Sequence, residues 1–300
     1  MQTLDYITIV LLLAGIFVAG SLFFGSGHNL RSFFAGGGNI PWWIGGLSLF
    51  MSFFSAGTFV VWGSIAYTEG WTAVTIQWMM AGGGVIAGLL IAPRWNRTGC
   101  LTAAEYITRR FGARVQKFYT ALFLSVSLFS TGTFLYSIAR IVETAVGISF
   151  ITSIQVLGLL CILYVAIGGF RAVVVTDVLQ FLILTAAVVI VLPLAFERIG
   201  GTDTLFRQTP EGFFRPAAGE YTWGFMLASL LGNASSLGGN WAFVQRYTSV
   251  ATPAAARKTG LLFGALYLVC PVVWMLPPML FRLHEPSLTG FGSENAYMLM

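Results

Sequence analysis

The amino-acid sequence predicts an all-α protein that crosses a membrane about eight times. Of its 300 residues, 57% are hydrophobic and only 9% are charged, whereas soluble domains carry about 25% charged residues. Apolar runs of about 20 residues, the length that a spanning helix needs, recur along the chain. Because lipid offers no partner for backbone N–H and C=O groups, such runs must form helices. The spans are predicted at residues 4–24, 43–67, 73–92, 118–142, 150–168, 173–196, 223–245 and 260–282.

The positive charge of the chain is explained by membrane topology. The net charge is +5, but no basic run with interleaved aromatic residues is present, so we expect no nucleic-acid partner. Eleven Lys and Arg residues lie in the connections that face inward if the amino terminus is outside, and five lie elsewhere. Positive residues gather in cytoplasmic loops. We therefore expect an integral protein of the plasma or inner membrane, in contact with membrane lipid, with its amino terminus outside.

The residues that carry most enzyme chemistry are few and scattered. Cys161 and Cys270 fall in apolar runs, Cys100 lies in a basic loop, and His28 and His284 lie in or near loops. These spacings match neither a metal site nor a disulfide framework. We therefore expect no enzyme activity and no organic cofactor.

The span at 43–67 has an unusual centre. Ser52, Ser55, Gly57 and Thr58 stand where an ordinary span carries Leu and Val. Small and polar residues weaken a helix, and unwound backbone at membrane depth is tolerated only where it lines a cavity or is buried in protein. In transporters such segments bind ions and substrates. Close packing between helices is the alternative explanation.

The span at 223–245 is interrupted in the same way. An Asn in hydrocarbon is costly without hydrogen-bond partners, so Asn233 must face other helices, a cavity or a ligand. The residues least suited to an unbroken helix are Gly232, Asn233, Ala234, Ser235, Ser236, Gly238, Gly239 and Asn240.

These two interrupted spans are the second and the seventh, an offset of five. Broken helices at matching places in two five-helix halves are typical of inverted-repeat transporters, with the binding site at the membrane midplane. The pair therefore favours transport over packing alone. We expect one transmembrane transporter domain with a leading helix in residues 1–30, a first repeat in 40–200 and a partial second repeat in 220–300.

Two connections have predictable roles. Residues 93–117 contain Thr102 followed by Glu105, the spacing of a helix capping box. Residues 197–222 combine acidic, basic and turn residues without a catalytic pattern. We expect a short cytoplasmic helix in the first connection and an outer cover in the second.

The run YVAIGGFRAVVVTDVLQ, from Tyr164 to Gln180, resembles the signature of the sodium:solute symporter family. That signature has a Gly-Gly pair, then a small residue, a Thr-Asp pair and a Gln. The pieces AGGGNIPWWIGGLSL, SAGTF and LTAAEYITRRFG, and the pair Gln245-Arg246, agree with the family in the same order. The resemblance covers nearly the whole chain.

The resemblance implies a leucine-transporter-type fold and sodium-coupled symport of a small polar solute by alternating access. Sodium, the coupling ion, would be held by the backbone carbonyls of Met51 and Phe54. Asp177 would be a coupling carboxylate near the inner side. Its alternative role is an acid in the first turns of a helix, favoured by the helix dipole.

The resemblance also places a solute site at Thr58, Gln77, Asn233, Ser236 and Leu237. Sugar-transporting relatives carry Gln in place of Thr58 and Glu in place of Gln77, so a galactose-like solute is not favoured. Gln77 has the alternative of hydrogen bonding within the helix bundle.

The length of the chain departs from the family. It accommodates the leading helix and core helices 1 to 7, and the helix whose hydroxyls complete the sodium site would lie beyond Met300. We therefore expect an amino-terminal portion of the family's core. A symporter-like sensory or regulatory membrane domain and an inactive truncated transporter are the alternatives.

Overall fold

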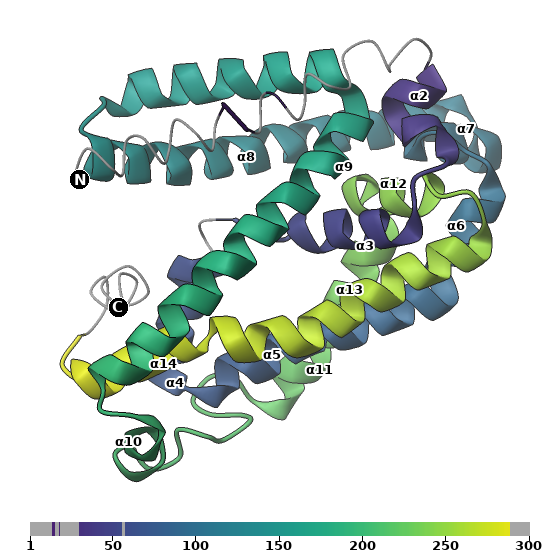
Figure 1. Ribbon diagram of the computed structural model, residues 1–300. Coiled ribbons are helices and arrows are strands. Elements are labelled where there is room, and N and C mark those ends of the chain that lie inside the picture. The colour runs from purple at the N-terminus through teal and green to yellow at the C-terminus, as the bar shows by residue number, and fades with distance from the viewer. Residues whose placement is uncertain (1–13, 16–17, 19–29, 56–57, 289–300) are drawn as a thin grey trace.

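The computed structural model describes residues 14–15, 18, 30–55 and 58–288, and in these residues every regular element is a helix. The predicted all-α class is thus confirmed (Figure 1). The predicted span at 4–24 lies almost wholly outside the described residues. Among the described residues, four stretches are long and apolar enough to cross a membrane: Trp71–Thr98, Ala113–Arg140, Gly168–Arg198 and Pro253–His284.

The span predicted at 43–67 is broken. Helix α3 (Trp42–Met51) ends at the predicted centre, and the chain resumes as a π-turn (Thr58–Trp62) that continues into α4 (Gly63–Glu69). Gly57 lies outside the described residues. A short helix, α2 (Leu30–Ala35), precedes α3 in the sequence.

The next span is a rod made of α5 (Trp71–Ile86), a π-turn η3 (Ala87–Ile91) and α6 (Ala92–Thr98). The connection that follows holds α7 (Ala103–Phe111), which begins as predicted. The Thr102 hydroxyl accepts the Glu105 N–H at 3.1 Å, and the Glu105 carboxylate accepts the N–H of Leu101 at 2.8 Å.

Helices α8 (Ala113–Val146) and α9 (Phe150–Arg198) follow. The spans predicted at 150–168 and 173–196 are joined within α9 by a sharp bend at Gly169, where φ is 57° and ψ is −163°. Phe33 packs against this glycine, and a Cβ there would lie 3.1 Å from the Phe33 ring. The bend separates α9 into two differently directed parts (Figure 1).

The connection at 197–222 contains α10 (Thr202–Arg207) and then folds over the start of α5. The carbonyl of the buried Phe213 accepts the N–H of Trp71 at 2.9 Å, and the Thr72 hydroxyl donates to the Arg215 carbonyl at 3.0 Å. The connection is therefore fastened to the helix that it covers.

The second interrupted span forms α11 (Trp223–Gly239) and α12 (Trp241–Thr248). The break lies at Asn240, whose side chain caps α12 by accepting the N–H of Ala242 at 3.0 Å. The helix continues through the other residues that were expected to disfavour it, because Ala234 and Leu237 are buried. The interruption is thus confirmed, but at the carboxyl-terminal limit of the predicted stretch.

The core is built around α13 (Pro253–Trp274), which packs against α3 and α5 and bends at Met275 into α14 (Leu276–His284). The prolines near the bend remove backbone donors and so favour it. By contrast, α8 lies apart from this core (Figure 1), and Phe129 on it is 76% exposed.

Three glycines allow the rod and α13 to cross closely. A Cβ added to Gly260 would lie 2.5 Å from the Cα of Gly88, and one added to Gly84 would lie 2.4 Å from the Phe263 ring. Backbones of two helices approach this closely only where side chains are absent.

We predict that Gly260→Ala lowers the melting temperature although Ala is the better helix former. The propensity gain is at most about 1 kcal/mol, whereas overpacking a tight contact costs about 1–3 kcal/mol. Gly232→Ala is the matched control, because nothing lies within 4 Å of a Cβ at that helical position. Thermal unfolding of the purified protein in detergent measures both variants. Equal effects of the two substitutions would contradict the prediction.

Candidate ion and solute site

The two helix breaks lie against each other. Phe53, in the first break, stacks on Phe243 of α12 with ring centroids 4.2 Å apart and an interplanar angle of 19°. Phe50, one turn earlier, packs edge-on against Tyr267 of α13 at 4.8 Å. Segments far apart in sequence therefore meet around one aromatic cluster.

The first break exposes backbone groups that a helix would use. The Met51 carbonyl accepts the N–H of Phe54 at 2.9 Å in a tight turn, and the Ser55 N–H donates to the Thr58 hydroxyl at 3.1 Å. A carbonyl oxygen has two lone pairs, so the Met51 carbonyl keeps one for a ligand. The Phe54 ring packs edge-on against Trp274 at 4.3 Å, which holds this turn in place.

The predicted solute residues with polar side chains lie on three elements: the π-turn after the first break, α5 and α11. Thr58 and Gln77 are buried, whereas Asn233 and Ser236 are partly buried. Gln77 lies on α5 and Asn233 on α11, and these helices are in contact: a Cβ on Gly83 would be 3.0 Å from the Asn233 Cβ. Gln77 and Asn233 therefore lie on neighbouring helices, whereas the π-turn that carries Thr58 packs mainly against α4.

Leu237 belongs to a different environment from the polar residues. Its side chain is fully buried in the main apolar cluster, together with Met51, and Phe54 packs against the same cluster. Leu237 and the turn that carries the predicted sodium carbonyls therefore belong to the same apolar cluster.

Asp177 lies in the interior and has two partners. The Ser48 hydroxyl of α3 donates to Asp177 Oδ2 at 2.5 Å, and Arg246 Nη2 of α12 lies 3.6 Å from the same oxygen. The two charged side chains are only 14% and 9% exposed. This cluster is separate from the residues predicted to bind the solute.

Arg246 is held from several directions. Its Nε donates to the Ser48 hydroxyl at 3.2 Å, its Nη1 donates to the Ala242 carbonyl, and its guanidinium lies 5.2 Å from the centre of the Phe170 ring. A buried charge is tolerated when it is paired and hydrogen-bonded. The pair therefore joins α3, α9 and α12 at one point.

The neighbouring Gln245 extends this junction. Its amide donates to the carbonyl of Phe34 in α2, and the Ile40 N–H donates to the Ser249 carbonyl at 3.1 Å. The Gln245-Arg246 pair thus ties the end of α12 to α2, α3 and α9. The sequence alone assigned no role to Arg246 or Ser48. A charged residue at the end of an apolar span is nevertheless a signal of function.

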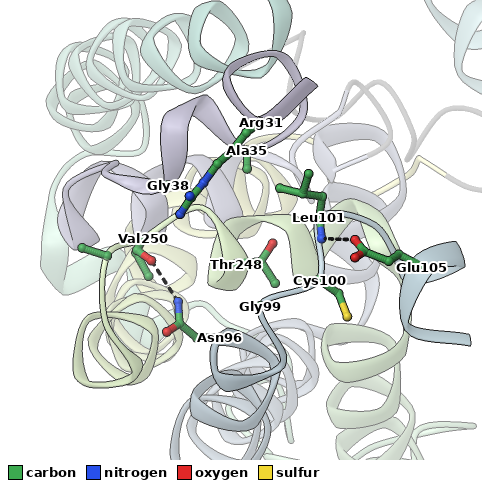
Figure 2. Close-up of a pocket in the computed structure, with 11 residues that line it drawn as sticks. Arg31, Ala35, Gly38, Asn96, Gly99, Cys100, Leu101, Glu105, Thr248 and Val250 are labelled. Atoms are coloured by element: carbon green, nitrogen blue, oxygen red, sulfur yellow. Dashed lines mark hydrogen bonds between the residues drawn. The ribbon is translucent and has the colours of Figure 1, made fainter. Parts of the chain in front are cut away.

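A polar cavity of about 330 Å³ lies beyond this junction, between α2, the α6–α7 connection and the end of α12. Figure 2 shows Arg31, Asn96, Thr248 and Glu105 around it, with the Asn96 amide donating to the Val250 carbonyl at 2.9 Å. Cavities that hold small ligands begin at about 300 Å³. The cavity is thus large enough to take a small solute close to the end of α12.

Comparison with known proteins assigns the family. Residues 33–270 match the Sodium:solute symporter family. The chain belongs to this family. The resemblance inferred from the signature is therefore confirmed, and the protein is an integral membrane protein.

The relatives and the solved structure are transporters. The chain is 26% identical over 308 residues to the sodium/sialic acid symporter SiaT of Proteus mirabilis, covering 99% of this chain and 62% of that protein. It is 28% identical over 272 residues to a sodium/glucose cotransporter of Vibrio parahaemolyticus, covering 84% and 50%. A solved substrate-bound, outward-open Na+-coupled sialic acid symporter superposes with a TM-score of 0.88 at 22% identity, covering 99% of this chain and 65% of that one. The chain therefore has this transporter fold and spans less than two thirds of the length of each of these proteins.

We predict strong energetic coupling between Asp177 and Arg246. Asp177→Asn and Arg246→Gln should each destabilise the protein by about 3–5 kcal/mol, because each leaves one charge buried without its partner. The double variant should cost less than the sum of the two, since neither charge remains. Thermal unfolding of the four proteins measures the coupling.

The exposed pair Arg140–Glu143 is the control, with its atoms 2.7 Å apart but its side chains 53% and 36% exposed. Neutralising it in the same way should change the melting temperature little, because water screens surface pairs. Additive effects of the Asp177 and Arg246 substitutions would show that the interior pair is not coupled.

Proposed function

We propose that the protein performs sodium-coupled symport of a small polar solute by alternating access. The observation that carries this proposal is the contact between the two helix breaks, Phe53 on Phe243, in a member of the sodium:solute symporter family. Binding between two broken helices at the midplane is how inverted-repeat transporters expose one site to each side in turn. The relatives bear the names of transporters, which supports transport over a sensory role.

We propose the carbonyls of Met51 and Phe54 as sodium ligands. A hard cation prefers oxygen ligands, and the turn after α3 presents carbonyls outside a regular helix. In this proposal the remaining ligands come from the second repeat. Sodium would then hold the break in the conformation that receives the solute.

Asp177 has a separate role in the proposal. Its carboxylate carries the negative charge that attracts a cation leaving toward the inner side, while Arg246 neutralises it in the arrangement seen here. Movement of α12 away from α3 would separate the two charges. Asp177 would then be free to accept sodium during release.

The solute is proposed to bind among Thr58, Gln77, Asn233 and Ser236, with Leu237 as an apolar wall. Amide side chains both donate and accept hydrogen bonds, which suits a solute with hydroxyl or carbonyl groups. Transport of this kind makes and breaks no covalent bond, so no enzyme chemistry is assigned.

The proposed topology keeps the amino terminus outside, with residues 1–30 as a leading helix, 40–200 as the first repeat and 220–300 as part of the second. The arrangement in Figure 1 supports this orientation, since α6, α7 and α12 gather at one end and α4, α10 and α14 at the other. The basic residues of α6 and α7 are those expected at the cytoplasmic face.

We predict that uptake depends on sodium. In proteoliposomes containing the whole protein, replacing Na+ by K+ at constant ionic strength should lower initial uptake of its solute more than about tenfold, because in this proposal sodium is the coupling ion and a site for it holds the larger K+ less well. Radiolabelled sialic acid and glucose are the first probes, since relatives carry these names. Equal uptake in Na+ and K+ would rule out sodium coupling.

We also predict that Gln77→Ala and Asn233→Ala each raise the apparent KM for the solute about tenfold, the equivalent of 1.4 kcal/mol. Each substitution removes a hydrogen-bonding amide from the proposed site. Gln155→Ala, at an exposed position of α9, is the control and should leave KM unchanged. A change within about twofold in both site variants would place the solute site elsewhere.

A further inference from the structure

A second cavity, of about 370 Å³, lies at the junction of η3, α6 and the start of α13. None of the residues assigned above to sodium, solute or coupling lines it. Its walls combine apolar and cationic side chains: Leu89, Leu90, Pro93, Arg94, Arg97, Pro253, Ala254 and Arg257. We call it the arginine groove.

The charge of the arginine groove is entirely positive. Arg94, Arg97 and Arg257 line it, and no carboxylate does. Within the described residues, none of the three guanidinium groups forms an ion pair with Asp or Glu. Arg94 uses one nitrogen to donate to the Leu90 carbonyl, which leaves further donors of its guanidinium for a ligand. Such a set of donors is complementary to phosphate oxygens.

The backbone adds to this positive potential. Helix α13 begins at Pro253, beside the groove, and runs for 22 residues. The amino-terminal end of a long helix carries a partial positive charge that favours anions. Thr252 caps the helix by accepting the Ala255 N–H at 3.1 Å, so the start of the helix is well formed.

The apolar surroundings decide what kind of anion fits. Val85, Leu89 and Leu90 are 39%, 42% and 53% exposed and lie on the same rod as Arg94, within the stretch long enough to span a membrane. These side chains form an apolar surface beside the groove. An anion in the groove therefore has a hydrocarbon surface directly adjoining it.

The geometry of the groove favours a headgroup with chains that extend along the rod. Towards the membrane interior, the Gly88–Gly260 crossing brings the two backbones too close for a ligand to pass between them. Acyl chains must then lie outside the crossing, over the exposed Val85 and Leu89. Free phosphate would make no use of this apolar surface.

We propose that the arginine groove binds the phosphate headgroup of an anionic phospholipid. Basic pockets between transmembrane helices on the cytoplasmic side are suited to anionic headgroups. The three arginines would hold the phosphate, and the Val85–Leu89–Leu90 face would contact an acyl chain. Since α6 and α13 also meet here, a bound lipid would link the two helices at the membrane surface.

Native mass spectrometry of the purified protein with added phosphatidylglycerol tests the proposal. Binding to the variant R94Q/R97Q/R257Q should be at least about tenfold weaker than to the parent protein. The control variant R110Q/R114Q/K117Q removes the same charge from exposed positions of α7 and α8, and should bind within about twofold of the parent. Melting temperatures measured without added lipid establish that both variants are folded.

Three outcomes would overturn the proposal. Equal binding of phosphatidylcholine, which carries no net charge, would show that the groove does not select an anionic headgroup. An equal loss in the control variant would assign the effect to overall surface charge. Displacement of phosphatidylglycerol by millimolar inorganic phosphate would identify a site for a soluble anion.

Discussion

The ion pair between Asp177 and Arg246 connects parts of the chain that are far apart in sequence. It joins α9 and, through Ser48, α3 to α12, with one oxygen of Asp177 accepting from Ser48 and lying 3.6 Å from Arg246. Two charges leave water only where their partners are well placed, so this junction constrains how the three helices approach one another. Both helix breaks adjoin the helices that meet here, because α3 ends at the first break and α12 begins at the second.

This arrangement places the turn with the proposed sodium ligands next to a short helix. Helix α12 comprises only the eight residues Trp241–Thr248. It carries Phe243, which stacks on Phe53, and Arg246, which pairs with Asp177. Rigid-body movement of so short a helix would change both contacts together, which is the kind of coupled rearrangement that alternating access requires. The arginine groove adds a proposed link to the bilayer at the start of α13.

Much of the fold was predictable from local patterns. Apolar runs predicted the four long helical stretches that could cross a membrane. The Thr102–Glu105 spacing predicted the start of α7, and weak helix formers predicted the interruption of both broken spans. The exact break in the second one was not predictable, because helix propensity alone cannot weigh the burial of Ala234 and Leu237 against the glycines around them. Similarly, the sequence predicted only a loop between the spans at 150–168 and 173–196, whereas the structure has a bend at Gly169 within one helix.

The sequence by itself determined the membrane class, the family and the elements that carry the candidate residues. Periodicity, composition and the signature from Tyr164 to Gln180 are properties of neighbouring residues. They can therefore be recognised without knowledge of the tertiary structure. Only the tertiary structure decided that Arg246 and Ser48 are the partners of Asp177, that Phe53 meets Phe243, and that three arginines line one groove. These contacts join residues up to about 200 positions apart. They depend on how helices pack, which no local pattern records.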